Sequence, residues 1–460
     1  MKHLHAFRYM GHLLLTVCVL LTFAACQSDR GDLVTLSATS SRAEVLTQPF
    51  DDNGVEGGQR AVLNPTTGTV VFSWQENDAL AIYAGGEGEN GLTNFSIASI
   101  NSENPAKAVF RANGFNLKAG NTYYAFYPYD ALQTDRSNVV FDYCNQRQKD
   151  NGAYDHLGAK DFQYSTPAVA EGNTDAANLK VALNHLGCIC RFTLSVSPAQ
   201  TYTNLRLEVL CGDEHIGIAT KCALCFSESP EVLPNTTSTL LDIALGEEDG
   251  KGISAEDGKL VVYAMLPPAD WSAYLLRLTL TAQYGAQSCK ISNTVAGKQM
   301  LAGKAYGYSA IVPGYVDLGL TYQDKPLLFA AQDFLANGIK SGGPFLQWPS
   351  EDPVTAQWGS NWRMPTLEEM QVLFEKNAAG YPCEWAATEE GVSVSNSTKG
   401  TTLYLPGQGN NSYYYWTSTA NDATTACFCS WEKEGGEVTT SMGNLPKIME
   451  AAIRPVYVGN

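Results

Sequence analysis

Hydrophobic and polar residues alternate along much of the chain, and this alternation predicts β-strands. In the segment 33–39, Val34, Leu36 and Ala38 share one side, which predicts a half-buried first strand. Further strands are expected over 68–74, 78–84, 108–110, 121–129, 181–186, 260–266, 275–280 and 303–312, with turn-rich segments between them. Twenty-three tyrosines and forty-one glycines agree with sheets joined by turns, so the fold is expected to be mainly β.

The pattern changes beyond residue 313, where six of the eight tryptophans fall. A strand is expected over 315–320 and another over 451–458, close to the C-terminus. One helix is predicted between them, with Thr366 as its N-cap and Glu369 completing a capping box. Its apolar stripe is formed by Leu367, Met370, Leu373 and Phe374. Residues 314–460 are therefore predicted to form a separate domain.

An apolar run over 13–25 follows a short basic start and is too brief to span a bilayer, so residues 1–25 are interpreted as a secretory signal peptide. The run ends in two alanines followed by Cys26, the pattern of a bacterial lipobox. Cys26 is therefore expected to carry a lipid, which would be the only membrane anchor. The alternative is an ordinary signal peptide followed by a coincidental cysteine.

The formal net charge is −17 and would become −19 without residues 1–25, which hold two basic residues and no acidic one. Such a surface repels nucleic acid and anionic lipid and favours neutral ligands, cations or proteins as partners. No cofactor is predicted. Neither an H-E-x-x-H nor a G-x-S-x-G motif occurs, and no catalytic residue is predicted, although carboxylates alone could serve a glycosidase.

Ten cysteines remain after Cys18 and Cys26, among them Cys188-x-Cys190, Cys222-x-x-Cys225 and Cys427-x-Cys429. A C-x-C spacing on a strand places both thiols on one face, where cysteine behaves as a small apolar core residue. The alternative is a structural zinc site, but too few histidines accompany these cysteines, and no metal ligand is predicted. The pairing of any disulfides stays open.

Several segments between 41 and 312 together resemble the fimbrillin-like family. They are Ser41-Arg42-Ala43, 72–83, Tyr124-Ala125-Phe126-Tyr127-Pro128, Asn184-His185-Leu186, 263–268 and 303–312. The resemblance implies a lipoprotein-derived subunit of a type V pilus, with two transthyretin-like β-sandwich lobes over 43–185 and 186–313. It also implies that an arginine-specific protease cuts between Arg42 and Ala43 and releases residues 26–42, the lipidated tether and first strand.

Removing a strand from a sheet leaves an apolar groove bordered by unpaired N–H and C=O groups. A strand from another subunit can fill this groove, so other pilus subunits are expected partners by strand exchange. The alternative for Arg42 is an exposed basic residue in a linker.

In the last third, 362–370, 403–407, 415–419 and Ile453-Arg454-Pro455-Val456 resemble the FISUMP-type domains of bacterial surface proteins. The resemblance implies an α+β domain similar in fold to C-type lectins over 314–460. The sugar-binding triplets of true C-type lectins are absent, and Asp352 and Asn421-Asp422 are the nearest candidates for calcium. Arg363 and Arg454 are expected to hold the domain together internally.

Tyr413, Tyr414 and Trp416 lie beside the polar segment 407–412 and are the candidate ligand-binding residues, since a ring face can bind a sugar or an apolar patch. The core of the domain is the alternative place for Trp416. The C-terminus is expected to be a paired strand that cannot be donated. The sequence therefore predicts a tip adhesin, exported to the outer membrane and then part of the pilus. The alternative is a non-polymerising outer-membrane lipoprotein that binds glycan or protein ligands at the cell surface.

Overall fold

The computed structural model describes residues 42–46, 61–64, 69–84, 91–103, 107–112, 117–172, 179–197, 200–284, 287–334, 346–407 and 411–459. Cys26, Val34, Leu36 and Ala38 lie outside the described residues, so lipidation and removal of the 33–39 segment stay predictions. Within the described ranges, no helix has both the length and the apolar character needed to cross a membrane.

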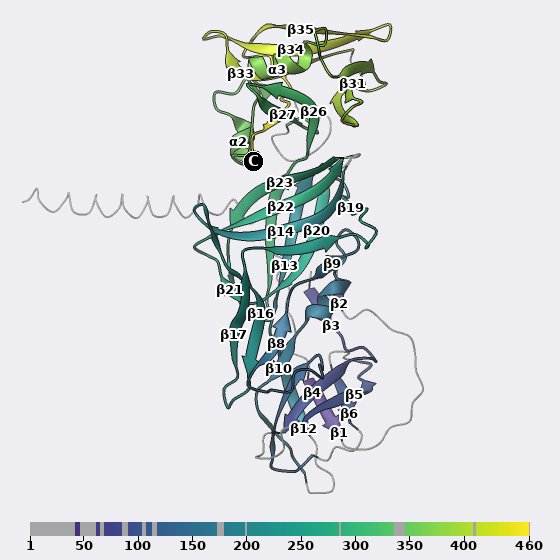
Figure 1. Ribbon diagram of the computed structural model, residues 1–460, viewed down its shortest axis with the longest axis vertical. Coiled ribbons are helices and arrows are strands. Elements are labelled where there is room, and N and C mark those ends of the chain that lie inside the picture. The colour runs from purple at the N-terminus through teal and green to yellow at the C-terminus, as the bar shows by residue number, and fades with distance from the viewer. Residues whose placement is uncertain are drawn as a thin grey trace, which may run out of the picture.

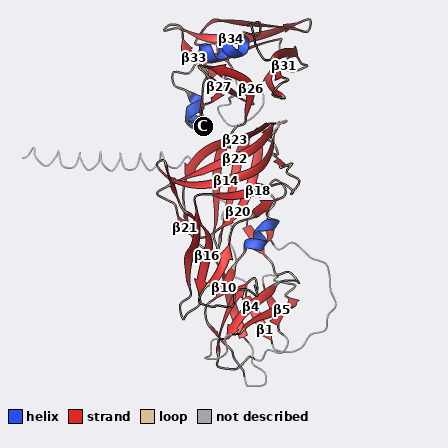
Figure 2. Ribbon diagram, viewed as in Figure 1, coloured by secondary structure: helices blue, strands red, loops and turns tan. Residues whose placement is uncertain are grey.

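The described chain is mainly β and has three parts that follow one another along its long axis (Figure 1). We call them the first lobe, the second lobe and the last domain. Helices are few, as Figure 2 shows: the 3₁₀ helix η1 (Asp155–Lys160) lies beside the second lobe, and α2 (Pro353–Trp358) and α3 (Leu367–Phe374) belong to the last domain. The mainly β fold confirms the expectation from alternation.

The first lobe is one sheet that closes on itself. Its strand order is β10-β12-β1-β6-β5-β4-β7-β11, and β10 also pairs with β7, which closes the circle. The alternating burial of β12 places Leu179, Val181 and Leu183 inside. The strands are β1 (Arg42–Leu46), β4 (Ala79–Ala84), β5 (Leu92–Ile100), β6 (Lys107–Arg111), β7 (Thr122–Tyr127), β10 (Gln163–Ser165), β11 (Ala168–Val169) and β12 (Leu179–His185), with the hairpin β2 (Ala61–Asn64) and β3 (Thr69–Phe72) as a separate sheet.

The second lobe is a sandwich of two sheets. One sheet has the order β20-β13-β25, and the other has the order β23-β22-β14-β18-β9, with β15 and β19 pairing onto β14. Buried leucines at 205, 207, 278 and 280 face Phe192 and Leu194 across the core. The strands are β9 (Gln146–Gln148), β13 (Cys188–Val196), β14 (Thr201–Cys211), β15 (Glu214–Ile216), β18 (Leu241–Leu245), β19 (Ile253–Ser254), β20 (Lys259–Leu266), β22 (Leu275–Tyr284), β23 (Gln287–Ala296) and β25 (Ala305–Val312), with the short pair β21 (Ala269–Asp270) and β24 (Gln299–Met300).

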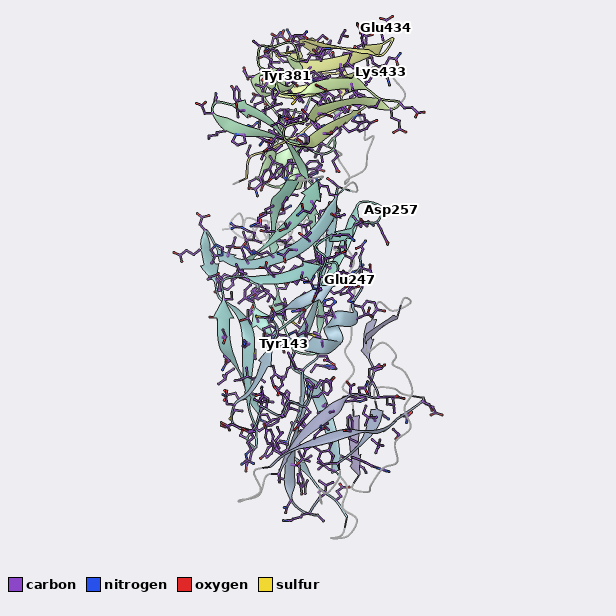
Figure 3. All side chains as sticks on the ribbon, turned by 45° about the vertical axis from the view of Figure 1, so that its right-hand side comes forward. Tyr143, Glu247, Asp257, Tyr381, Lys433 and Glu434 are labelled. Atoms are coloured by element: carbon purple, nitrogen blue, oxygen red, sulfur yellow. The ribbon has the colours of Figure 1, made fainter. Side chains whose placement is uncertain are left out.

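The first lobe's β12 ends at His185 and the second lobe's β13 begins at Cys188, but an earlier segment, 139–148, also pairs with strands of the second lobe. Strand β8 (Val139–Asp142) pairs with β16 (Ile218–Cys225), which also pairs with β17 (Glu231–Ser238). Strand β9 likewise pairs with β18 of the second lobe. Tyr143, between these two strands, is fully buried in an aromatic cluster shared by both lobes (Figure 3). The segment 139–148 therefore belongs to the second lobe, because its two strands pair with β16 and β18.

The last domain contains one four-stranded sheet of order β26-β27-β37-β29 and two three-stranded sheets. Helix α3 packs Met370, Leu373 and Phe374 into their shared core, as its apolar stripe predicts. The strands are β26 (Tyr315–Tyr322), β27 (Lys325–Ala330), β28 (Leu346–Gln347), β29 (Trp362–Arg363), β30 (Glu384–Ala387), β31 (Gly391–Asn396), β32 (Thr401–Pro406), β33 (Ser412–Ala420), β34 (Thr425–Glu434), β35 (Glu437–Pro446), β36 (Glu450–Ala451) and β37 (Val456–Tyr457).

The C-terminal strand β37 lies in the middle of its sheet, paired with β27 on one side and β29 on the other. The end of the chain lies at the junction with the second lobe (Figure 1). There the ring of Tyr457 stacks on Tyr315 with centroids 4.9 Å apart and contacts Trp362 at 5.0 Å. The C-terminal segment is thus an internal part of the fold.

Candidate functional site

The rings at 413, 414 and 416, the candidate ligand residues, do not form one exposed surface. Tyr413 and Trp416 are 1% and 0% exposed, whereas Tyr414 is 40% exposed. Tyr413 stacks on Trp431 and donates a hydrogen bond to Asp333, and the Trp416 indole donates one to the carbonyl of Leu346 at 2.7 Å. Tyr413 and Trp416 are therefore corrected to core residues.

The alternation of β33 explains this outcome. Odd-numbered Tyr413 and Tyr415 face the core of the last domain, and Tyr414 shares the opposite face with Trp416. Strand β28, which pairs with β36, covers that opposite face at Trp416 and leaves it open at Tyr414. Sequence alone gives the alternation but not the segment, distant in the chain, that covers Trp416.

Tyr414 is joined by rings that sequence reasoning missed. Its ring lies 5.4 Å from that of half-buried Phe428 on β34. Further along β33, the indole of Trp348 donates to the carbonyl of Thr417, and the ammonium of Lys447 lies 4.5 Å above the Trp348 ring. We call Tyr414, Phe428 and Trp348 the aromatic surface. Half-exposed rings beside a cation can stack on a sugar ring or bind an apolar patch of a protein.

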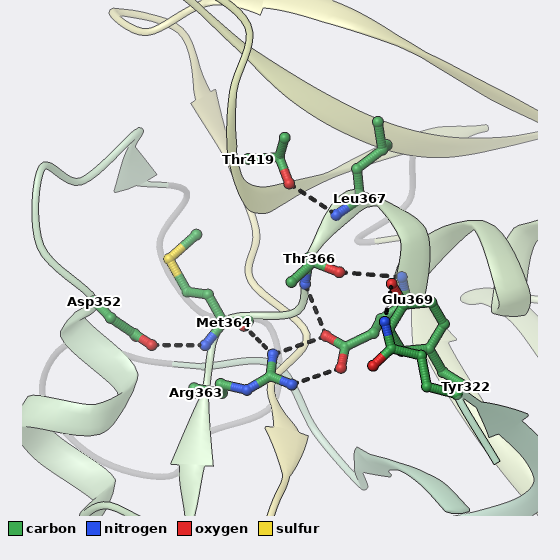
Figure 4. A network of polar contacts seen from close by, with 9 residues as sticks. Tyr322, Asp352, Arg363, Met364, Thr366, Leu367, Glu369 and Thr419 are labelled. Atoms are coloured by element: carbon green, nitrogen blue, oxygen red, sulfur yellow. Dashed lines mark hydrogen bonds and ion pairs between the residues drawn. The ribbon is translucent and has the colours of Figure 1, made fainter. Parts of the chain in front are cut away.

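Arg363 is held inside the last domain, as expected. Its guanidinium donates two hydrogen bonds to Glu369, at 2.7 and 2.5 Å (Figure 4). The same carboxylate accepts from the backbone N–H of Thr366, whose hydroxyl accepts from the N–H of Glu369, which completes the predicted capping box. Arg363 thus fixes the start of α3, and its guanidinium is already paired with Glu369.

Arg454 forms a second internal centre, with an exposed fraction of zero. Its guanidinium lies 2.6 Å from Asp333 and donates to the carbonyls of Ala330 and Tyr404, each at 3.1 Å. Burial raises the pKa of Asp333, and the charge of Arg454 offsets part of that rise. This pair ties the C-terminal segment to β27 and β32 and leaves no charge free for a ligand.

The acidic candidates for calcium are used as local caps. Asp352 is the N-cap of α2, accepting from the N–H groups of Val354 and Thr355, and also accepts from Met364 N–H. Asp422 accepts from the N–H groups of Thr424 and Thr425, and these bonds hold the pKa of Asp422 below its ordinary value. Within the described ranges, no group of three or more histidine, cysteine or acidic side chains could hold a metal ion.

The cysteines of the two C-x-C pairs and His185 are part of the buried core. Cys188, Cys190 and Cys429 are fully buried and Cys427 nearly so, which confirms the core interpretation of both C-x-C pairs. Burial raises the pKa of Cys429 to about 12, so this thiol stays protonated. His185 is buried and its ring bonds the Asp161 carboxylate at 2.5 Å, as expected for a satisfied core histidine.

The candidate cleavage position, Arg42–Ala43, lies at the start of β1. This strand is antiparallel to β12, with Arg42 opposite Ala182, and parallel to β6, with Arg42 opposite Lys107. The segment 33–39 was expected to supply the removable strand, but the first described paired strand begins at Arg42. A cut between Arg42 and Ala43 would therefore leave four residues of β1 in the sheet.

No protein-family model and no curated protein sequence matches the chain. Among solved structures, a protein from Bacteroides uniformis to which a role in cell adhesion has been ascribed is similar at 15% identity and a TM-score of 0.33, over 59% of this chain and 93% of that one. A similar ascription applies to a Bacteroides eggerthii protein (12% identity, TM-score 0.31, 61% and 88% covered). A fimbrial protein from Bacteroides ovatus is similar over 92% of this chain and 99% of its own, at 11% identity and a TM-score of 0.25. Likenesses this weak do not establish a common fold or function.

Proposed function

We propose that this protein is a cell-surface subunit of a pilus, that it occupies the tip, and that its last domain carries the ligand-binding surface. The central observation is the position of the C-terminus. A subunit within a shaft must donate a strand to its neighbour, but β37 is paired on both edges and packs Tyr457 into the junction with the second lobe. Such a subunit can accept a strand, whereas β37 is already paired and is not available to be donated.

The acceptor site of this proposal is the place of β1 between β6 and β12. Cleavage after Arg42 would make Ala43 the new N-terminus and leave a strand of only four residues there. Its backbone hydrogen bonds to β6 and β12 could be replaced by those of a longer strand from another subunit. The proposal thus assigns cleavage the role of weakening β1, and the peptide that ends at Arg42 would leave with the lipid on Cys26.

The aromatic surface is the proposed adhesive site because it combines exposed Tyr414 and half-buried Phe428 and Trp348 with the Lys447 ammonium above the Trp348 ring. The proposal has no catalytic step. Its ligand is a glycan or a protein, since the acidic chain disfavours nucleic acid.

Variants in the producing bacterium test the proposed assembly. Arg42→Ala is expected to leave the precursor uncut and to remove the protein from purified pili, whereas Arg30→Ala, an arginine within the same leader, should behave as wild type. The N-terminus of the pilus-bound protein, read by mass spectrometry, should be Ala43. Unchanged incorporation of the Arg42→Ala protein would refute the proposal.

The alternative is a lipoprotein that does not polymerise and presents the last domain directly from the outer membrane. It is favoured by the pairing of β1 on both edges, since a complete circle of strands needs no donor. In this case the mature protein keeps residues 26–42 and no pilus subunit co-purifies with it.

A further inference from the structure

A cleft of about 480 Å³ lies between the second lobe and the last domain, apart from the aromatic surface. Its floor is the outer face of β13 and β25, which carries Thr193, Ser195 and Ser309. One wall is the segment Asn293–Val295 of β23, and the other is the C-terminal end of α2 around Gln357. Its volume falls within the range of about 300–1,000 Å³ typical of small-molecule sites, which favour such domain junctions.

The chemistry of this cleft is neutral and polar. Among the described residues, those that line it include hydroxyl and carboxamide side chains but no charged one, although the chain carries a net charge of −17. A divalent cation would require carboxylate or carbonyl oxygens gathered at one point, and a phosphate would require basic groups or a helix N-terminus. Hydroxyls and amides can both donate and accept hydrogen bonds, which matches a ligand made of hydroxyl groups.

The cleft does not offer an edge for an added strand. In the parallel pair of β13 and β25, Ile189 N–H bonds the carbonyl of Lys304, so the even-numbered residues of β25 bond to β13. The odd-numbered residues therefore direct their N–H and C=O groups to the open edge of β25. Two of those carbonyls are already bonded, Gly307 by the Lys298 ammonium and Ile311 by the Asn293 amide. A peptide strand would have to displace both side chains, which favours a small ligand over strand addition.

The walls of the cleft are held in place before any ligand binds. The Asn293 amide donates to Ile311 O at 2.8 Å and to Trp358 O at 3.3 Å, which joins β23, β25 and α2. Gly359 has a φ of +90°, and an added Cβ would lie 3.0 Å from Asn293 Oδ1. Asn361 also donates to Ser292 O. A site fixed in this way loses little entropy when it binds.

We propose that this cleft binds a short neutral oligosaccharide, with hydroxyls bonded by Thr193, Ser195, Ser309 and Gln357 and C–H groups packed on Ile311. The inference rests on the proposed adhesive role and deepens it by naming a ligand class and a second site. The two proposals can fail separately, because pilus incorporation does not depend on the lining of the cleft.

The test uses the full chain with Cys26→Ser, so that no lipid is attached, and saturation-transfer NMR and calorimetry with two probe panels. Maltotriose, cellotriose, lactose and N,N′-diacetylchitobiose are the neutral probes, and sialyllactose and a heparin tetrasaccharide are the anionic ones. At least one neutral probe should bind and the anionic ones should not. The double variant Thr193→Arg with Ser309→Arg should weaken neutral binding at least tenfold.

Thr239→Arg, at an exposed position in the turn between β17 and β18, is the matched control and should bind as wild type. Tyr414→Ala should also retain this binding, because the aromatic surface is a different site. Circular dichroism confirms that the double variant folds. The inference is overturned if no neutral probe binds, if the arginine pair leaves binding unchanged, or if only anionic probes or an extended peptide bind.

Discussion

The pair Arg454–Asp333 gives the sharpest test of what holds the last domain together. The two side chains are 0% and 3% exposed and lie 2.6 Å apart, and the only other hydrogen bond described for Asp333 comes from Tyr413 at 3.3 Å. Arg454→Met leaves a buried carboxylate without its partner and removes the donor to two backbone carbonyls. Removing one member of such a pair costs about 3–5 kcal/mol of unfolding free energy, a large share of a domain's stability.

The assay is urea unfolding followed by tryptophan fluorescence, which reports mainly on the last domain because six of the eight tryptophans are there. The double variant Arg454→Met with Asp333→Leu should regain most of the loss, since two apolar side chains need no partner. The matched control is Lys399→Met in the same domain. Lys399 lies 2.9 Å from Asp317, but the two side chains are 43% and 23% exposed, so its loss should cost less than about 1 kcal/mol.

The destabilisation caused by Arg454→Met is also predicted to depend on pH. Burial already raises the pKa of Asp333, and loss of Arg454 would raise it further. Below the unfolded pKa of about 3.9 the carboxyl is protonated in both states, so the variant carries no charge penalty. As pH rises from there to the folded pKa, the unfolded state releases its proton first and the penalty grows. The destabilisation should thus be smaller at pH 4 than at pH 7, and a cost under about 1 kcal/mol at pH 7 would refute the reasoning.

Three further predictions concern other parts of the chain. Trp416→Ala removes a fully buried side chain and should cost about 3–5 kcal/mol of unfolding free energy, measured by urea unfolding. Tyr414→Ala should change stability by less than about 0.5 kcal/mol but weaken ligand binding at the aromatic surface. Met442→Ala, at a similarly exposed position, is the control for both measurements. Thr366→Ala removes the N-cap of α3 and should cost about 1 kcal/mol, and Thr366→Ser should restore most of it. Burial lowers the pKa of His156, whose ring bonds Tyr263 O. On acidification the unfolded state therefore takes up a proton before the folded state does, and stability should fall as pH drops below about 6.5. His156→Gln should flatten this decline between pH 7.5 and 5.5.

Local patterns in the sequence predicted the elements whose causes are local. The capping box of α3 and its buried stripe follow from residues within one turn of each other, and both were found. Strand β4, with its buried Leu80 and Ile82, was also predicted within one residue at its start. The expectation that Arg363 and Arg454 act internally was right, because a charged residue flanked by core residues must find a partner inside.

Long-range pairing could not be predicted in the same way. Nothing near Phe141 indicates that β8 pairs with β16, some eighty residues further along the chain. Trp416 shows the same limit, since β28 covers it from a position seventy residues earlier. The cleft was missed because Thr193, Ser309 and Gln357 are unremarkable polar residues until three distant elements bring them together. Contacts of this kind follow from the whole fold rather than from any local pattern.

The second lobe and the last domain share a buried core at their junction, and this restricts the protein in which the ligand sites can be studied. Trp358, Trp362 and Tyr457 belong to the same buried cluster as the core of the second lobe, and Gly314 N–H bonds the Ser197 hydroxyl across the boundary. Expression of residues 314–460 alone would expose these aromatic rings to water, and each buried aromatic side chain contributes about 2–3 kcal/mol or more. It would also remove the floor and one wall of the cleft. Because the junction completes both the buried core and the cleft, ligand binding by the last domain has to be measured on the intact chain.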